Sequence, residues 1–461
     1  MFKKILIANR SEIAVRVIRA CREMGIKSVA VYSEADRESL HVRLADEAVC
    51  IGPAPAASSY LDVEAVLGAA KVTGAEAVHP GYGFLAENAG FCQACRDAGL
   101  VFIGPKPEAI RRLGFKSSAR DLARKAGVPI VPGSMGLLGH DFMAEASKVG
   151  FPVMVKAAAG GGGKGLRLVR EAKDLEAQIR MAKAEAGAAF KDDSVYLEKF
   201  IEHPRHVEIQ IAADEAGGIV AFPERDCTVQ RRHQKLIEES PSPVVTSDIR
   251  RRMQEAARSL AKAAGYTNVG TVEFLLDTDG SFYFMEVNTR LQVEHPVTEL
   301  VTGLDLVNLQ IRLAAGEKMP FGQDRASEIR AHSIEHRINA EDPAHGFAPC
   351  PGTIERVSLP GGPGVRVDTH IYPGYTVPSY YDSLIAKLII SAPDRDGAVA
   401  RGLRAFGEFS IDGIKTTIPF HCSVLAHPLF KGGKFDTSFI EAMKAPGGEP
   451  FREPVKEGQP A

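Results

Sequence analysis

Two strand-like runs that meet at Asp279-Gly280 constrain how the middle of this chain can fold. Polar and apolar residues alternate through much of 271–288, and Asp-Gly between two such runs is typical of a type I′ β-hairpin turn. A two-residue loop at this place predicts that Glu273 lies directly opposite Glu286. Cross-strand neighbours are only about 5 Å apart, and like charges at that distance are destabilising. The pattern therefore predicts a cation between these two carboxylates.

A row of polar residues continues beyond this hairpin. Asn288, Arg290, Gln292 and Glu294 follow Glu286 at a spacing of two residues, so an extended chain projects all of their side chains to one side. Such a row is costly to bury without ligands, and Mg²⁺ binds through one or two carboxylates together with substrate phosphates. We interpret the row as a site for ATP and a metal ion; a solvent-facing polar strand is the alternative.

A glycine-rich run between two strand-like segments indicates a second phosphate-binding element. Gly160, Gly162 and Gly165 match G-x-G-x-x-G, but the pattern predicts no helix after them, and Lys164 precedes glycine rather than Ser or Thr. Neither a Rossmann turn nor a P-loop therefore applies. We expect a hairpin flap whose backbone N–H groups close over phosphates, with Lys156 as a neighbouring cation. A surface hairpin without a ligand is the alternative.

The hexamer 230–235 is basic and reads Gln-Arg-Arg-His-Gln-Lys. It is isolated and is followed by Glu238-Glu239, so a small anion or a phosphate fits it better than a nucleic acid does. A solvated loop remains the alternative interpretation.

Composition excludes several classes of protein. The 461 residues correspond to about three domains. A net charge of -2 argues against a protein that coats nucleic acid or anionic membranes, and no run approaches the about 18 apolar residues of a membrane-spanning helix. Seven scattered cysteines are typical of reduced, cytoplasmic thiols. Cys92 and Cys95 are expected one turn apart on a helix rather than in a metal or redox site.

The N-terminal region predicts a βαβ unit, with strands at 4–8 and 28–32 and a helix at 12–24. Its first turn, residues 8–12, contains no glycine, which disfavours dinucleotide binding and therefore an NAD-dependent oxidoreductase. Further along, we expect helices at 171–189, 247–264 and 395–409, mostly strands over 195–290, and a β-rich region after about 330.

Six segments together resemble the ATP-grasp ligases and, within them, the biotin carboxylases, up to about residue 443. They are His79–Phe84, Lys156–Gly165, Arg205–Gln210, Glu224–Lys235, Met285–Pro296 and Arg337–Asp342. The Arg-Arg-His-Gln-Lys and Arg-Ile-Asn-Ala-Glu-Asp motifs are what narrow the resemblance to biotin carboxylases.

The resemblance implies a fold that combines α/β and α+β parts. It comprises an N-terminal Rossmann-like (pre-ATP-grasp) domain at 1–114, an ATP-grasp domain at 115–330 with a mobile glycine-rich lid at about 131–203, and a β-rich biotin carboxylase C-terminal domain at 331–445. A disordered tail is expected at 446–461.

It also implies the site residues. The residues expected to bind ATP are Lys116, Lys156, Gly162, Gly163, Glu198, Lys199, Phe200, Ile201, His206, Gln230, His233, Glu273 and Glu286. The expected ligands of Mg²⁺ or Mn²⁺ are Glu273, Glu286 and Asn288, and bicarbonate is expected at Lys235, Arg290, Gln292 and the Val293 backbone. The expected catalytic residues are Glu294 as general base, Arg337, Arg290 and Lys235, and Tyr82 joins Arg337 in binding biotin.

The implied reaction uses ATP and bicarbonate to form carboxyphosphate, whose carboxyl group passes to biotin on a biotin carboxyl carrier protein. Biotin is then a carrier-bound substrate that is not attached to this chain, and Lys444 is expected to stay unbiotinylated. A carboxyltransferase partner and a homodimer are also implied. The acceptor expected first is acetyl-CoA, with pyruvate and propionyl-CoA carboxylases as alternatives; a non-catalytic scaffold is disfavoured because the mapped catalytic positions are intact.

The chain departs from the family pattern at two glycine positions, Ser11 and Ala159. We expect Ser11 to cap the first helix, so that the turn is retained. Ala159 is expected to stiffen the flap slightly.

Overall fold

A computed structural model describes residues 1–134, 141–157, 166–190, 192–443 and 451. The chain forms two compact units. Unit 1 comprises residues 1–128, 205–274 and 286–461, and unit 2 comprises 129–204 and 275–285. The glycine run with Gly162 and Gly163, together with Ala159 and Lys444, lies outside the described residues.

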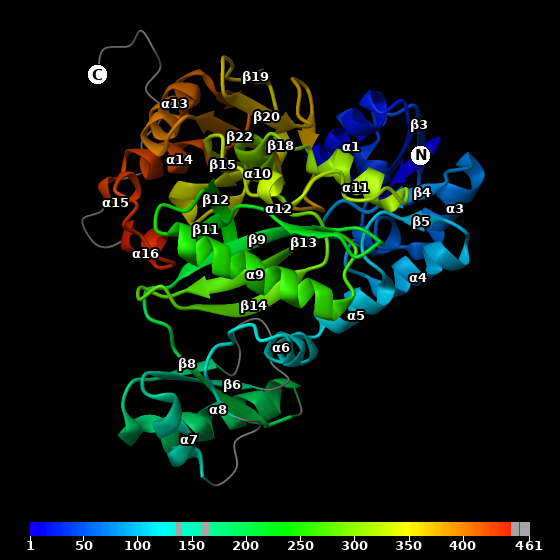
Figure 1. Ribbon diagram of the computed structural model, residues 1–461. Coiled ribbons are helices and arrows are strands. Elements are labelled where there is room, and N and C mark those ends of the chain that lie inside the picture. The colour runs from blue at the N-terminus through cyan, green and yellow to red at the C-terminus, as the bar shows by residue number, and fades with distance from the viewer. Residues whose placement is uncertain (135–140, 158–165, 191, 444–450, 452–461) are drawn as a thin grey trace, which may run out of the picture. The chain divides into compact units, whose positions relative to one another are not determined.

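The N-terminal part of unit 1 contains a parallel sheet of order β3-β2-β1-β4-β5 (blue to cyan in Figure 1). Ile5 and Ile7 face one hydrophobic core while Leu6 faces another, as expected for a strand buried on both sides. The predicted βαβ unit is confirmed. The elements are β1 Lys4–Ile7, α1 Ser11–Glu23, β2 Lys27–Tyr32, α2 Leu40–Leu44, β3 Glu47–Cys50, α3 Val63–Thr73, β4 Ala77–His79, α4 Ala89–Asp97, β5 Val101–Phe102, α5 Pro107–Gly114 and α6 Lys116–Lys125.

The start of α1 differs from the prediction. Arg10 occupies the N-cap position without a side-chain cap, and Ser11 is the first helical residue, with φ 65. Its hydroxyl lies 2.9 Å from Nδ1 of His370 instead of capping the helix. A left-handed backbone explains why glycine suits this position, since only glycine adopts it without steric cost.

A nine-stranded sheet forms the centre of unit 1, with the order β14-β13-β9-β11-β12-β15-β22-β20 and β10 beside β9. Helix α9 packs on β9 and β10, and α10 packs on β12, β15 and β22 (Figure 1). The strands are β9 Arg205–Ala213, β10 Ile219–Ala221, β11 Arg225–Arg231, β12 Gln234–Ser240, β13 Asn268–Leu276, β14 Phe282–Asn288, β15 His332–Asn339, β20 Val365–Thr369 and β22 Leu384–Ala392. The following helices are α9 Ser247–Ala264, α10 His295–Thr302, α11 Leu306–Ala314 and α12 Gln323–Ala326.

The turn between β13 and β14 also differs from the prediction. The N–H of Asp277 donates to the carbonyl of Ser281 at 2.8 Å, and the N–H of Gly280 donates to the carbonyl of Asp277 at 3.1 Å. Gly280 has φ 83, whereas Asp279 is not left-handed, so this is not a type I′ turn. The loop has one residue more than predicted and matches a type I turn followed by a left-handed glycine. The two-residue loop from which the direct opposition of Glu273 and Glu286 was expected is therefore not present.

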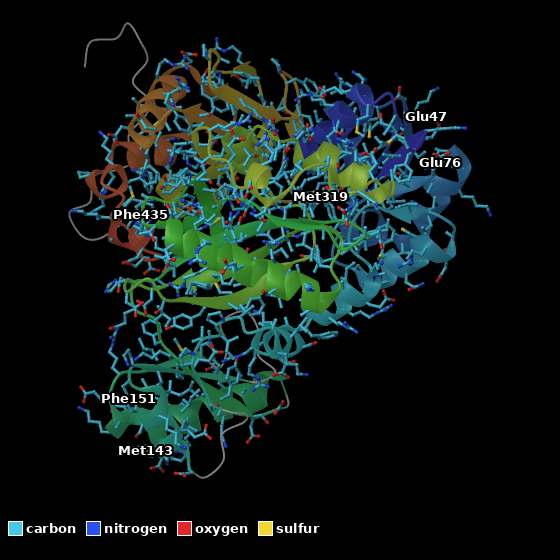
Figure 2. All side chains as sticks on the ribbon, viewed as in Figure 1. Glu47, Glu76, Met143, Phe151, Met319 and Phe435 are labelled. Atoms are coloured by element: carbon cyan, nitrogen blue, oxygen red, sulfur yellow. The ribbon has the colours of Figure 1, made fainter. Side chains whose placement is uncertain are left out.

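The C-terminal part of unit 1 surrounds β15, β20 and β22 with short elements and helices. Phe435, labelled in Figure 2, belongs to its core, and the ring of Phe451 packs edge-to-face on Phe347 and Phe420. The elements are β16 Glu341–Asp342, β17 Ala348–Pro349, β18 Gly352–Thr353, β19 Arg356–Ser358, β21 Thr376–Val377, α13 Arg395–Glu408, β23 Ser410–Asp412, α14 Ile418–Ala426, α15 Pro428–Lys431 and α16 Phe439–Met443.

Unit 2 contains a three-stranded antiparallel sheet of order β7-β6-β8. Its strands flank the glycine run as predicted, and Val153, Val155 and Leu197 are fully buried in its core. The elements are α7 Phe142–Val149, β6 Val153–Ala157, β7 Leu166–Val169, α8 Leu175–Phe190 and β8 Val195–Lys199.

The seven cysteines form no disulfide. Cys92 and Cys95 lie on helix α4, as predicted, and both are buried there. Among the described residues, no helix is long and apolar enough to cross a membrane.

The backbone at Ser11 gives a testable prediction. Ser11→Ala and Ser11→Gly both remove the hydroxyl that contacts His370, but only alanine keeps the steric cost of the left-handed backbone. We expect Ser11→Gly to be more stable than Ser11→Ala by about 1 kcal/mol. Urea denaturation of both variants measures this difference, and equal stabilities would show that residue 11 is not left-handed.

Candidate active site

The centre of the site is the ammonium group of Lys235 on β12. Its Nζ donates to Glu208 Oε2 at 2.6 Å, to Glu273 Oε1 at 2.7 Å and to Glu294 Oε1 at 2.8 Å. The lysine side chain is only 11% exposed. Burial alone would lower the pKa of Lys235, but its anionic neighbours raise it well above the ordinary value. Lys235 is therefore a permanent cation that joins β9, β12, β13 and the start of α10.

Glu294 is held by two cations. Besides Lys235, Arg337 on β15 donates from its Nη2 to Glu294 Oε2 at 2.9 Å, and its Nε donates to Glu238 Oε1 at 2.6 Å. Burial acts to raise the pKa of Glu294, but the charges of Lys235 and Arg337 hold it well below its usual range. This carboxylate is fully buried and ionised. The structure thus brings together three of the predicted catalytic residues.

Glu273 on β13 collects the remaining polar side chains. It accepts from Asn288 Nδ2 at 2.8 Å and from Gln292 Nε2 at 3.1 Å, and its Oε2 lies 2.8 Å from His206 Nε2. Burial acts to raise the pKa of Glu273, but Lys235 and His206 lower it. Arg290 completes the cluster by donating to Asn288 Oδ1 at 3.0 Å and to Gln292 Oε1 at 3.1 Å.

The predicted row converges as expected, but not as a continuous strand. Strand β14 ends at Asn288, and Glu294 lies in a turn with φ -80 and ψ 11, directly before α10. Pro296 lies in the first turn of α10, a position where proline favours the start of a helix. This turn places Glu294 beside Lys235. Arg290 has a further partner that is not part of the row, because its Nε donates to Glu87 Oε2 at 2.8 Å.

The expected metal ligands Glu273, Glu286 and Asn288 provide two carboxylates and an amide. Burial, followed by the negative charge of Glu273, raises the pKa of Glu286, while Lys116 Nζ lies 3.9 Å from its Oε2. A divalent cation between the carboxylates would relieve this repulsion, and hard oxygen donors suit Mg²⁺ or Mn²⁺. The residues present therefore fit the metal. Two other groups among the described residues, His206-Glu208-Glu273 and Glu208-Cys227-Glu294, could hold an ion by their spacing, but Lys235 already neutralises their carboxylates.

Further predicted ATP ligands lie in unit 2. Lys156 on β6 forms an ion pair with Glu198 on β8, which is 6% exposed. Lys199 donates to the carbonyls of Gly150 and Phe151 at 3.1 and 2.9 Å. The remaining two, Phe200 and Ile201, directly follow β8 in the chain.

The other predicted residues lie at separate places of unit 1. Arg232 and His233 form the exposed tip of the β11–β12 hairpin with φ 49 and 67, and Gln230 Nε2 lies 3.5 Å from His206 Nδ1. The hydroxyl of half-buried Tyr82 donates to Glu12. The carbonyl of Val293 accepts from Lys387 Nζ at 2.9 Å.

Sequence reasoning missed several buried charges around these residues. Arg225 is fully buried and its Nε donates to Glu208 Oε1 at 2.6 Å, while Glu238 accepts from Arg337. The spacing of His206, Glu208 and Gln210 in the fully buried strand β9 was a detectable signal, since polar residues on every second position of a buried strand share one face.

Three family models match successive parts of the chain. The chain matches the family descriptions "Biotin carboxylase, N-terminal domain" over residues 1–110, "Carbamoyl-phosphate synthase L chain, ATP binding domain" over 116–321 and "Biotin carboxylase C-terminal domain" over 335–442. The fold is that of an ATP-grasp ligase.

Individual relatives cover nearly the whole chain. A biotin carboxylase of Nostoc sp. is 54% identical over 96% of this chain and 99% of its own length. A pyruvate carboxylase subunit of Methanothermobacter thermautotrophicus is 50% identical over 100% of this chain and 94% of its own. A crystal structure of the biotin carboxylase domain dimer of Hydrogenobacter thermophilus 2-oxoglutarate carboxylase, with MgADP, ADP and bicarbonate, has a TM-score of 0.87 at 46% identity, over 96% of this chain and 98% of that one. The chain belongs to the biotin carboxylase family.

The Lys235 cluster makes a prediction about pH. Lys235→Met leaves three buried carboxylates without their common cation, so we expect the free energy of unfolding to fall by about 3–5 kcal/mol. The pKa values of Glu273 and Glu294, which Lys235 holds low, then rise, and that of Glu208, already raised by burial, rises further. The folded variant therefore binds protons as the pH falls. The deficit relative to wild type should shrink between about pH 8 and about pH 6.

Urea denaturation at both pH values measures this deficit. Lys262→Met, at an exposed position on α9, is the matched control and should show no deficit at either pH. A deficit of Lys235→Met that stays the same at both pH values would contradict the role of Lys235 as the shared counter-charge.

Proposed function

We propose that the protein carboxylates biotin on a biotin carboxyl carrier protein, using ATP and bicarbonate through carboxyphosphate. The observation that carries this proposal is the fully buried carboxylate of Glu294 between the cations of Lys235 and Arg337. An ionised carboxylate that can accept a proton, placed beside two fixed cations, suits the binding of a small anion that must lose a proton. The solved relative with MgADP and bicarbonate supports these ligands.

Bicarbonate binding is assigned to Lys235, Arg290, Gln292 and the backbone of Val293. Glu294 is the general base. While both cations hold it, Glu294 is ionised but weakly basic. Bicarbonate that binds to Lys235 takes over part of the ammonium's hydrogen bonding, so the pKa of Glu294 rises toward a value at which it accepts the proton. The resulting dianion is the nucleophile toward the γ-phosphate.

Biotin is assigned to Arg337 and Tyr82. Negative charge develops on the ureido oxygen when biotin loses its N1′ proton, and a guanidinium directed at that oxygen stabilises it. Arg337 is 13% exposed and is held by Glu238 and Glu294, so its orientation is set before biotin arrives. This pre-organisation avoids reorganising the guanidinium during the reaction.

ATP binding is assigned to the residues named from the family resemblance, and metal binding to Glu273, Glu286 and Asn288. Mg²⁺ or Mn²⁺, when bound, neutralises charge on the phosphates. Lys116 and Lys156 supply cations for the phosphates, and His206 and Gln230 are further assigned ATP ligands; His206 also contacts Glu273. The assigned ATP ligands Gly162 and Gly163 lie outside the described residues, and His233, Glu198, Lys199, Phe200 and Ile201 complete the set.

The protein is further proposed to act as one component of a larger assembly. We assign it the domain limits 1–114, 115–330 and 331–445, a homodimeric state, and carrier and carboxyltransferase partners. The biotin carboxylase relatives support acetyl-CoA as final acceptor, and the pyruvate carboxylase relative supports pyruvate as the alternative. Seven cysteines without disulfides support a cytoplasmic location.

Turnover with free biotin tests the reaction. We expect the purified protein with Mg²⁺ to hydrolyse ATP in a manner that depends on both biotin and bicarbonate. Glu294→Gln keeps the shape but removes the base, so we expect a loss of about 100-fold or more in this turnover with ATP binding retained. Steady-state kinetics and nucleotide titration measure both quantities. Wild-type turnover in Glu294→Gln would refute the role of Glu294.

Co-purification tests the partners and the acceptor. We expect tagged protein expressed in its own cells to retain a biotinylated carrier and a carboxyltransferase. Acetyl-CoA-dependent release of the carboxyl group by that complex would support the first acceptor, and pyruvate-dependent release would contradict it in favour of the alternative.

A further inference from the structure

A lysine outside the predicted site lies in β22, a largely apolar strand of the large sheet. Strand β22 reads Leu-Ile-Ala-Lys-Leu-Ile-Ile-Ser-Ala, and Lys387 is its only charged residue. The side chain is 0% exposed. A buried ammonium is costly unless it is paired and fully hydrogen-bonded, so its contacts indicate why it is there.

The register of the sheet places Lys387 beside a catalytic residue. It pairs with Arg337 on β15 and with Asp368 on β20. Helix α10 packs on β15 and β22, and α1 packs on β20 and β22. The two cations, Arg337 and Lys387, are therefore cross-strand neighbours next to the helix that begins directly after Glu294.

The ammonium of Lys387 joins two parts of the proposed site. It donates to the carbonyl of Val293 at 2.9 Å and lies 3.2 Å from Glu12 Oε2 on α1. Glu12 in turn accepts a hydrogen bond from the hydroxyl of Tyr82, and Lys387 Nζ lies 5.9 Å from the centre of the Tyr82 ring. Burial acts to lower the pKa of Lys387, but the charges of Glu12, Glu335 and Asp368 raise it, so the lysine stays an ammonium.

The carbonyl of Val293 belongs to the peptide that leads into Glu294. The preceding carbonyl, that of Gln292, accepts from the N–H of His295 at 3.3 Å and lies 2.8 Å from His295 Nδ1. Lys387 therefore supplies the side-chain contact that orients the next peptide of this turn. A carbonyl oxygen that faced a bound anion would repel it, so its orientation affects both bicarbonate binding and the placement of Glu294.

We infer that Lys387 is a positioning residue that orients the Val293–Glu294 peptide for bicarbonate and, through Glu12, holds Tyr82 for biotin. The inference rests on the proposed function, which assigns bicarbonate to Val293 and biotin to Tyr82. One buried cation, Lys387, thus couples the bicarbonate and biotin subsites. Among the described residues, none of the assigned ATP ligands contacts Lys387.

Three variants test this inference by separate Michaelis constants. Lys387→Met removes the ammonium at nearly constant volume, and we expect the KM values for bicarbonate and for free biotin to rise about tenfold, with the KM for ATP within about twofold of wild type. Lys387→Arg restores the cation and should recover much of both losses. Lys262→Met on the surface of α9 is the matched control and should leave all three constants unchanged.

The outcomes separate this inference from the proposed function. A wild-type protein without biotin-dependent turnover would refute the proposed function itself. An active wild type with unchanged bicarbonate and biotin constants in Lys387→Met would overturn the inference, as would a rise in all three constants that arginine does not rescue.

If Lys387→Met does not fold, Glu12→Gln tests the same coupling. It keeps an acceptor for Tyr82 but removes the charge that holds Lys387, so we expect the KM for biotin to rise at least about threefold while that for ATP is retained. An unchanged KM for biotin in this variant would overturn the inference.

Discussion

Three carboxylates share the ammonium of Lys235, and the remainder of the site depends on this interaction. Glu208, Glu273 and Glu294 come from β9, β13 and the turn before α10, and Lys235 comes from β12. Like charges so close together are unstable without a common counter-ion. The cation therefore makes the strand arrangement compatible with a dense group of acids, and it also creates a place where a small anion can compete for hydrogen bonds.

A second layer of buried charges holds this centre in place. Arg225 donates a hydrogen bond to Glu208 and neutralises its charge. Glu238 accepts a hydrogen bond from Arg337 and so keeps its guanidinium beside Glu294. Lys387 on β22, the strand next to β15, is another buried cation of this kind, and it joins the backbone at Val293 to Glu12. Each cation contacts groups from different segments, so the network positions the reactive side chains to a degree that no single strand could.

The differences between expectation and structure have local physical causes. The hairpin at 277–281 has one residue more in its loop because only Gly280 is left-handed. The polar row leaves the extended conformation where β14 ends at Asn288, and Pro296 favours the start of α10 directly after Glu294. Ser11 does not cap α1 because its left-handed backbone directs the hydroxyl to His370. None of these changes removes a residue from the site, because the long-range ion pairs still select which side chains converge.

The sequence by itself determined the elements whose signals are local. The βαβ unit, the helix at 247–264 and the strands around the glycine run follow from hydrophobic periodicity, and the spacing of Glu273 and of the row after Glu286 predicted a polar site. The resemblance then assigned Lys235, Glu294 and Arg337 their roles. Only the tertiary structure decided that Glu208, Glu238 and Lys387 support them, because the order of strands in the sheet brings together residues far apart in the chain. A lone lysine in an apolar strand carries no local signal of its partners; they are set by which strands and helices pack beside it.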